Sequence, residues 1–180
     1  NLPKAIPYRT AYYNNDWGFC LTKEQYNLLK NNSKQTFNVN INSTFRNGNM
    51  PYGELLIKGK TNKEILISCY ICHPNIANDG LSGVALTSLL SKYILQFKRT
   101  QWSYRIIFVP ETIGAIAYCK LNQKKFKNIQ YGLVVTCVGG KGKFGYKQSW
   151  DSNSEINYIV EKNFKKLKIN YKKYKFDIHG

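Results

Sequence analysis

Arginine, histidine, acidic residues and long apolar runs are scarce in this sequence, and each shortage narrows what the chain can do. Only four of its 27 basic residues are arginine and ten residues are acidic, so lysine makes the net charge of +17. Proteins that read nucleic-acid sequence favour arginine for bidentate contacts, so this charge does not favour a nucleic-acid partner. No stretch of about 20 apolar residues is present, so we expect no membrane-spanning helix.

The five cysteines are an odd number, and three of them lie within apolar strand or helix patterns. Such a distribution is typical of free, buried thiols in a reducing compartment. Because nothing at the start resembles a signal peptide, we predict a cytoplasmic protein. The chain of 180 residues ends directly after a strand-like segment, and we interpret it as part of a longer protein.

The sequence divides into two parts that differ in pattern. Residues 1–50 contain clustered aromatics and turn-forming segments, and we predict an irregular, strand-rich domain with a short helix over 23–30. From residue 51 to 180, strands and helices alternate, which predicts an α/β sandwich. The expected strands are 53–58, 64–70, 104–109, 132–137 and 144–147, and the expected helices are 80–97, a short one after 111, and 153–167.

The last of these helices enters the stretch of densest positive charge, residues 161–175. Lysines occupy one of its faces and apolar residues the other, which is typical of a surface helix over a sheet. A phosphate-binding or membrane-surface face is the alternative interpretation.

Residues 65–84, ILISCYICHPNIANDGLSGV, lead from a buried strand through polar residues into a helix. The apolar run at the start is typical of a strand covered on both faces, and apolar residues later recur at helical spacing. His73, Asn78 and Asp79 lie between the two patterns. In open α/β sheets, ligands bind beyond the carboxyl ends of the strands, so we predict the functional site here.

Several motifs in this order, CYICHP, NIANDGLSG, YRIIFVPETIGAIAY and GLVVTCVGG, resemble those of the zinc aminopeptidase-like exopeptidases. The resemblance is to a bacterial family of aminopeptidase-like proteins linked to polysaccharide biosynthesis. It implies a three-layer α/β/α zinc-exopeptidase-like sandwich, into which the small β-rich domain of residues 1–50 is inserted. It also implies a zinc cofactor, a peptide or amide-bearing small-molecule substrate, and a continuation that begins with an SDERQY segment contributing to the site.

The resemblance implies roles for three residues. His73 and Asp79 would hold zinc, and Glu111 would be the general base that takes a proton from a zinc-activated water. Each acid also has a plainer interpretation. Asp79 is a good helix N-cap, and Glu111 would be favoured by the helix dipole in a first turn.

Two further acids are predicted to bind substrate. Asp16 lies beside Trp17 and is expected to form one wall of the pocket, where it would recognise a free amine. Its alternative role is in a turn beside an aromatic mini-core. Asp151 matches an acid of the family and is otherwise the N-cap of the helix that follows it.

Four residues depart from the family's pattern at or beside ligand positions: Tyr70, Thr112, Cys137 and Gly140. They favour an alternative function, a degenerate, non-catalytic peptidase fold that binds an amide or amino-sugar ligand in polysaccharide biosynthesis. A zinc site made of Cys69, Cys72 and His73 is disfavoured, because neighbouring residues on a strand point to opposite faces. Since catalytic zinc sites keep three protein ligands, we expect this chain alone to bind at most one zinc ion weakly and not to hydrolyse aminoacyl substrates.

Overall fold

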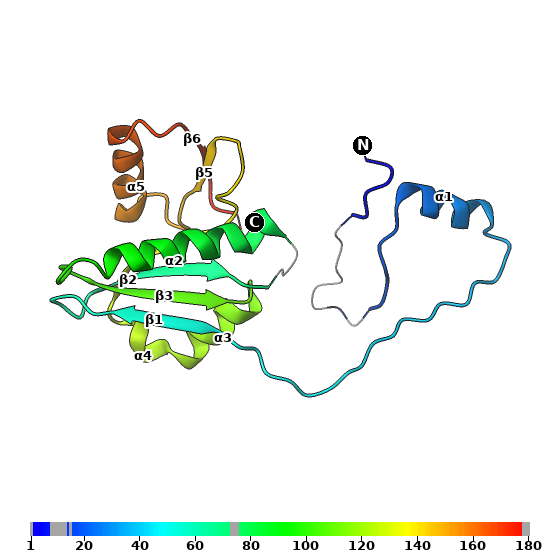
Figure 1. Cartoon of the computed structure of the whole chain (residues 1–180), viewed down its shortest axis with the longest axis horizontal. Coiled ribbons are helices and arrows are strands. Elements are labelled where there is room, and N and C mark those ends of the chain that lie inside the picture. The colour runs from blue at the N-terminus through cyan, green and yellow to red at the C-terminus, as the bar shows by residue number, and fades with distance from the viewer. Residues whose placement is uncertain (1, 8–13, 15, 73–75, 178–180) are drawn as a thin grey trace. The chain divides into compact units, whose positions relative to one another are not determined.

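A computed structural model describes the chain except for residues 1, 8–13, 15, 73–75 and 178–180. It divides into two compact units, Asn1–Asn47 and Gly48–Gly180, which are treated separately below (Figure 1).

The described residues of the first unit contain one helix, α1 (Lys23–Asn31), which begins with a capping box. Thr22 Oγ1 accepts a hydrogen bond from the Gln25 N–H (3.1 Å), and Gln25 Oε1 accepts one from the Thr22 N–H (3.0 Å). The described residues of this unit form no strand, so the strand-rich character expected of residues 1–50 is not found in them. Strands need a paired neighbour and an apolar face to bury, whereas Trp17 and Phe19 are 69% and 53% exposed.

The second unit is built on a four-stranded sheet in the order β1-β3-β2-β4. Its strands are β1 (Gly53–Ile57), β2 (Glu64–Tyr70), β3 (Ser103–Val109) and β4 (Ile129–Val134). β1 runs antiparallel to β3, whereas β2 is parallel to both β3 and β4. In register, Tyr70 pairs with Val109 and Ser68 with Val134. The three parallel strands therefore end at one edge of the sheet, called the carboxyl edge below.

Helices cover both faces of this sheet (Figure 1). They are α2 (Ser82–Ile94), α3 (Ile113–Leu121) and α4 (Gln123–Phe126). Neighbouring residues of β3 point to opposite faces, so Ile106 packs with Ile94 of α2, whereas Ile107 packs with Tyr118 of α3. The arrangement confirms the predicted α/β fold with a sheet between helical layers.

A smaller module completes the second unit, with strands β5 (Phe144–Lys147) and β6 (Tyr171–Tyr174) in parallel and helix α5 (Glu155–Lys166). Phe164 of α5 packs its ring against Tyr146 and Tyr171, at centroid distances of 6.0 and 4.8 Å. Lys173 Nζ of β6 lies 2.7 Å from a carboxylate oxygen of Glu161. The lysine-rich helix thus packs its aromatic side onto a two-stranded sheet.

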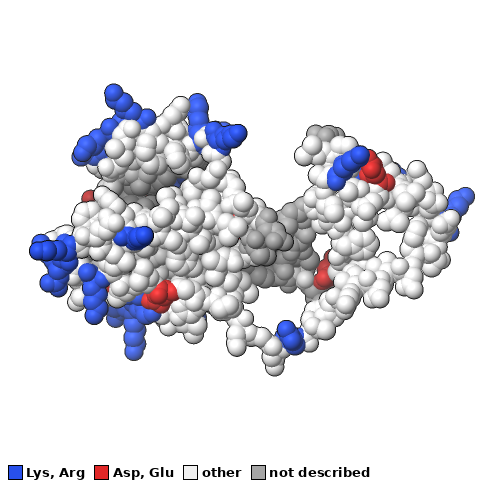
Figure 2. All heavy atoms as spheres, viewed as in Figure 1, with Lys and Arg blue, Asp and Glu red and all other residues white. Residues whose placement is uncertain are grey.

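The surface charge reflects the excess of lysine over acidic residues in the sequence. Figure 2 shows many lysines and arginines on the visible face and few acids among them. In the part of the chain that the structure describes, no helix has the length and apolar character needed to cross a bilayer.

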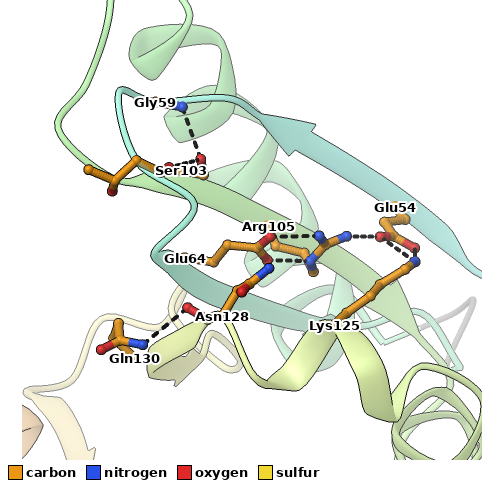
Figure 3. A network of polar contacts seen from close by, with 9 residues as sticks. Glu54, Gly59, Glu64, Ser103, Arg105, Lys125, Asn128 and Gln130 are labelled. Carbon is orange, nitrogen blue, oxygen red and sulfur yellow. Dashed lines mark hydrogen bonds and ion pairs between the residues drawn. The ribbon is translucent and has the colours of Figure 1, made fainter.

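A buried ionic network lies on the α3–α4 face of the sheet, away from the carboxyl edge (Figure 3). Arg105, 5% exposed, donates from Nε and Nη2 to the two Glu64 oxygens at 2.5 and 2.8 Å, and from Nη1 to Glu54. Lys125 Nζ lies 2.9 and 3.0 Å from the Glu54 oxygens. These bonds join β1, β2, β3 and α4. The sequence patterns did not predict the network.

Candidate active site at the carboxyl edge of the sheet

Each parallel strand delivers polar side chains to the carboxyl edge. β2 is followed by Cys72 and Asp79, β3 by Glu111, and β4 by Thr136. The loops after neighbouring strands touch, because the Glu111 N–H donates to Cys72 Sγ (3.3 Å) and Thr136 Oγ1 donates to Asp79 Oδ1 (3.2 Å). The loops that follow β2, β3 and β4 therefore meet at one edge of the sheet.

Asp79 lies in a kinked turn, η1 (Ala77–Leu81), between β2 and α2. Its backbone is extended (φ −87°, ψ 119°), and Gly80 after it has φ +86°, a conformation that favours glycine. The N-cap of α2 is Leu81, and no side chain caps it. Asp79 is therefore not the N-cap of α2, and its carboxylate is held by Thr136 instead.

Short side chains fasten the Asp79 loop to the loop after β4. Asn78 Oδ1 accepts a hydrogen bond from the Gly139 N–H (2.8 Å), and Ser82 Oγ accepts one from the Val138 N–H (3.0 Å). A Cβ at Gly83 would lie 2.3 Å from the carbonyl oxygen of Val135. The small residues of the LSG motif thus let α2 start close to the end of β4.

Glu111 lies in a tight turn between β3 and α3. The Ile113 N–H donates to the Glu111 carbonyl (2.6 Å) across Thr112, whose φ of 55° and ψ of −74° form a γ-turn of the rare positive-φ kind. Helix α3 begins at Ile113, with Thr112 as its N-cap and no acid in its first turn. The alternative role of Glu111 as a first-turn acid therefore does not apply.

The loop after β4 has a second strained residue, Cys137, with φ 53° and an exposed side chain. The strand itself ends at Val134, three residues earlier than predicted. The Val135 N–H still donates to the Ser68 carbonyl (2.9 Å), but the chain then turns out of the sheet to bring Thr136 to Asp79.

Tyr70, the last residue of β2, is half-buried among these groups. Burial raises the pKa of its phenol, and the negative charges of Glu111 and Asp79, together with Cys72 and Cys137, raise it further. At neutral pH the phenol therefore keeps its proton and can donate a hydrogen bond.

Cys69 lies on the opposite face of β2 from Tyr70, next to α2. It is 0% exposed, burial raises the pKa of its thiol, and its Sγ lies 3.8 Å from the Gly80 carbonyl oxygen. Cys72, in contrast, faces Glu111. This divergence agrees with the expectation that Cys69 and Cys72 do not form one zinc site.

Three other residues were predicted to belong to the site. His73 lies outside the described residues. Asp16 belongs to the first unit, where its carboxylate accepts the Trp17 N–H (2.8 Å), and its role as a pocket wall stays a prediction. Asp151 accepts the Asn153 N–H (2.9 Å) in the turn before α5, whose N-cap is Ser154. Its substrate-binding role also stays a prediction.

Two polar residues that the sequence analysis missed organise these loops. Thr136 orients Asp79, and its place directly after an apolar strand that ends at the site was the available signal. Buried Asn157 of α5 accepts from the Tyr146 hydroxyl (2.8 Å) and the Ser149 N–H (3.1 Å), and donates to the Asp151 carbonyl (3.0 Å). An asparagine inside a helical pattern gave no such signal.

The side chains at the carboxyl edge include ligand types that bind zinc, but they supply only part of the number of ligands that a zinc site needs. Asp79 offers a carboxylate oriented by a hydroxyl, the outer-shell support usual for metal-binding carboxylates. Among the residues that the structure describes, no three His, Cys, Asp or Glu side chains are grouped to hold a metal ion. Because His73 is not among them, its ligand role stays a prediction.

Comparison with known proteins places this geometry in a family context. The family model described as "Domain of unknown function (DUF4910)" matches residues 4–180. A Clostridium acetobutylicum protein, assigned by name to polysaccharide biosynthesis and to an aminopeptidase-like domain, is 45% identical over 157 residues, which are 87% of this chain and 35% of the relative. The chain thus spans about a third of that relative's length.

Two solved structures are similar. A candidate peptidase from Clostridium acetobutylicum superposes with a TM-score of 0.82 and 39% identity, over 98% of this chain and 41% of that one. A glutaminyl cyclase from an Acidobacteriales bacterium gives a TM-score of 0.58 and 16% identity, over 72% and 52% of the two chains. The second likeness concerns the fold alone.

Proposed function

The chain belongs to the DUF4910 family, and from this membership and the geometry of the carboxyl edge we propose that it is part of a metal-dependent, aminopeptidase-like hydrolase. The observation that carries the proposal is that Asp79 does not cap α2 and that Glu111 does not lie in the first turn of α3. The Asp79 carboxylate instead accepts a hydrogen bond from Thr136, and the backbone N–H of Glu111 donates one to Cys72. In open α/β sheets, ligands bind beyond the carboxyl ends of the strands, and both acids lie there.

In this proposal Asp79 and His73 hold zinc. When bound, zinc polarises the scissile carbonyl and lowers the pKa of a water molecule. The Glu111 carboxylate accepts the proton of the attacking water and delivers it to the departing amine. Tyr70, protonated at neutral pH, donates a hydrogen bond to the substrate.

The substrate is a peptide or an amide-bearing small molecule with a free amine, which Asp16 and Asp151 help to recognise. The relative assigned by name to polysaccharide biosynthesis supports an amide-bearing intermediate of such a pathway.

A second candidate function is a non-catalytic fold that binds an amide or amino-sugar ligand without hydrolysing it. It is favoured by the absence, among the described residues, of three metal-binding side chains in one group. Tyr70, Thr112, Cys137 and Gly140, which stand at or beside ligand positions, support it too.

The two candidates differ in their dependence on Glu111. In the full-length protein, we expect Glu111→Gln to lower turnover of an aminoacyl p-nitroanilide by about 10²–10⁴-fold, because the general base is lost. Zinc content should stay unchanged, since Glu111 is not proposed as a ligand. The matched control is Glu161→Gln, which changes an acid of the α5–β6 ion pair.

Equal turnover in the wild type and Glu111→Gln would reject the catalytic role of Glu111. A wild type that binds the aminoacyl p-nitroanilide but contains no zinc and shows no turnover would support the non-catalytic candidate.

A further inference from the structure

Three residues other than glycine have a positive φ in the described part of the chain: Thr112, Cys137 and Lys168. Lys168 follows the C-cap of α5, a place where left-handed residues commonly end helices. Thr112 and Cys137 lie at the carboxyl edge and follow two different strands. Strain of this kind in side-chain-bearing residues persists only where the surroundings enforce it, and it concentrates at functional sites.

Thr112 fixes the backbone on one side of Glu111. The γ-turn joins the Glu111 carbonyl to the Ile113 N–H, while the Glu111 N–H is held by Cys72. Both backbone polar groups of Glu111 are therefore occupied. The position from which its side chain leaves the chain is set by these two bonds.

The surroundings enforce this turn. A Cβ at Gly114 would lie 2.6 Å from Pro110 Cδ, so the start of α3 is pressed against the residue that follows β3. The Ile116 N–H donates to the Thr112 carbonyl (2.9 Å) and commits the next residues to the helix.

Cys137 plays the corresponding part for Asp79. It directly follows Thr136, whose hydroxyl donates to Asp79 Oδ1, and it directly precedes Val138, whose N–H is held by Ser82. The left-handed residue therefore makes the bend that lets its two neighbours bind the Asp79 loop at once.

We infer that Thr112 and Cys137 are positioning residues, whose left-handed backbones set where the carboxylates of Glu111 and Asp79 stand. The inference rests on the proposed function, because the strain has a purpose only if both acids act on one substrate. Neither residue touches the reacting atoms. Each acts through its neighbour, Thr112 through Glu111 and Cys137 through the bond from Thr136 to Asp79.

Glycine at either position removes the strain and also the restraint, because glycine adopts left-handed and right-handed backbones with similar ease. A purely structural role predicts that glycine stabilises the protein or leaves it unchanged, with no other effect. A positioning role predicts that function falls while thermal stability does not. A misplacement of about 1 Å at a catalytic group costs up to about 10²-fold in rate.

The test compares Thr112→Gly, Cys137→Gly and the control Lys168→Gly in the full-length protein. We expect all three melting temperatures to equal or exceed that of the wild type. Thr112→Gly should lower kcat by at least about 10-fold with KM and zinc affinity nearly unchanged, since it loosens only the base. Cys137→Gly should weaken zinc affinity by about 10–100-fold in a chelator competition, since it loosens the support of a ligand. Lys168→Gly should match the wild type in every measurement.

If a glycine variant fails to fold, asparagine replaces it, because asparagine tolerates left-handed backbones while keeping a side chain. Thr112→Asn should then retain more kcat than Thr112→Ala, because asparagine adopts a positive φ more readily than alanine. Wild-type values for both edge variants, or equal losses in the Lys168 control, would overturn the inference. A wild-type protein without zinc and without turnover would instead overturn the proposed function itself.

Discussion

At the scale of single residues, the site is shaped by the partners of its acids. Asp79 and Glu111 are half-exposed and exposed, and what distinguishes them from ordinary surface acids is that Thr136 holds the Asp79 carboxylate and Cys72 holds the Glu111 backbone. The buried pair Arg105 and Glu64 shows the opposite case, a charged contact that ties strands together away from the site.

Thr136 is predicted to support metal binding through its hydroxyl. Thr136→Val keeps the shape of the side chain and removes the donor to Asp79, so zinc affinity should fall by about 10–100-fold. Thr136→Ser keeps the donor and is the matched control. Competition with a fluorescent zinc chelator measures both, and equal affinities for Val and Ser would show that this hydrogen bond does not support the site.

Glu54 is predicted to make stability depend on pH. Burial alone would raise the pKa of its carboxyl, but Lys125 and Arg105 outweigh that effect and lower it below the ordinary 4.5. A lowered folded-state pKa stabilises the protein above the unfolded-state value, and this stabilisation is lost as the pH falls through the folded-state value.

Denaturant unfolding between pH 7 and pH 3 checks this. Glu54→Gln should lose about 1–3 kcal/mol at pH 7, where bonds to charged partners are removed, and should lose less as the pH falls below 4.5. Parallel pH profiles for the variant and the wild type would contradict the account.

At the scale of elements, α2 shows how far a sequence pattern reaches. The strand–loop–helix order of residues 65–84 was predictable, because apolar runs and helical spacing depend on local burial. The start of α2 at Ser82 and the close approach at Gly83 were not, because they depend on where β4 leaves the sheet. The α/β fold and the edge carrying the acids were likewise predictable. The Thr136 contact was not, because it joins segments distant in sequence, and the turn at Thr112 was not, because it requires a rare backbone conformation.

Gly83→Ala tests that close approach. An alanine inside a helix normally stabilises it by about 1 kcal/mol relative to glycine. Here the new Cβ would meet the Val135 carbonyl oxygen at 2.3 Å and Cys69 Sγ at 2.8 Å, and the backbone oxygen has little freedom to move. We therefore expect a loss of about 1–3 kcal/mol in the free energy of unfolding.

Gly142→Ala is the control, since nothing lies within 4 Å of its added Cβ. The same denaturant titration compares the two variants. An unchanged or increased stability for Gly83→Ala would mean that α2 does not press on the end of β4.

At the scale of the whole molecule, the α/β unit and the superposition on a solved candidate peptidase agree on a peptidase-like fold. The small first unit, whose described residues form one helix and no strand, contributes little core of its own. Its part in the site, through Asp16, stays a prediction. The net charge of +17 concerns solubility and non-specific attraction and does not identify a partner.

The central claim is that the acids at the carboxyl edge belong to a zinc-dependent hydrolase. The most direct test measures zinc content and aminoacyl p-nitroanilide turnover together, in the 180-residue chain and in a form extended through the segment that follows Gly180 in longer relatives. Each is prepared with and without Glu111→Gln. We predict weak binding of at most one zinc and no turnover for the shorter form, and stoichiometric zinc with Glu111-dependent turnover for the extended one. An extended form with neither zinc nor turnover would contradict the account.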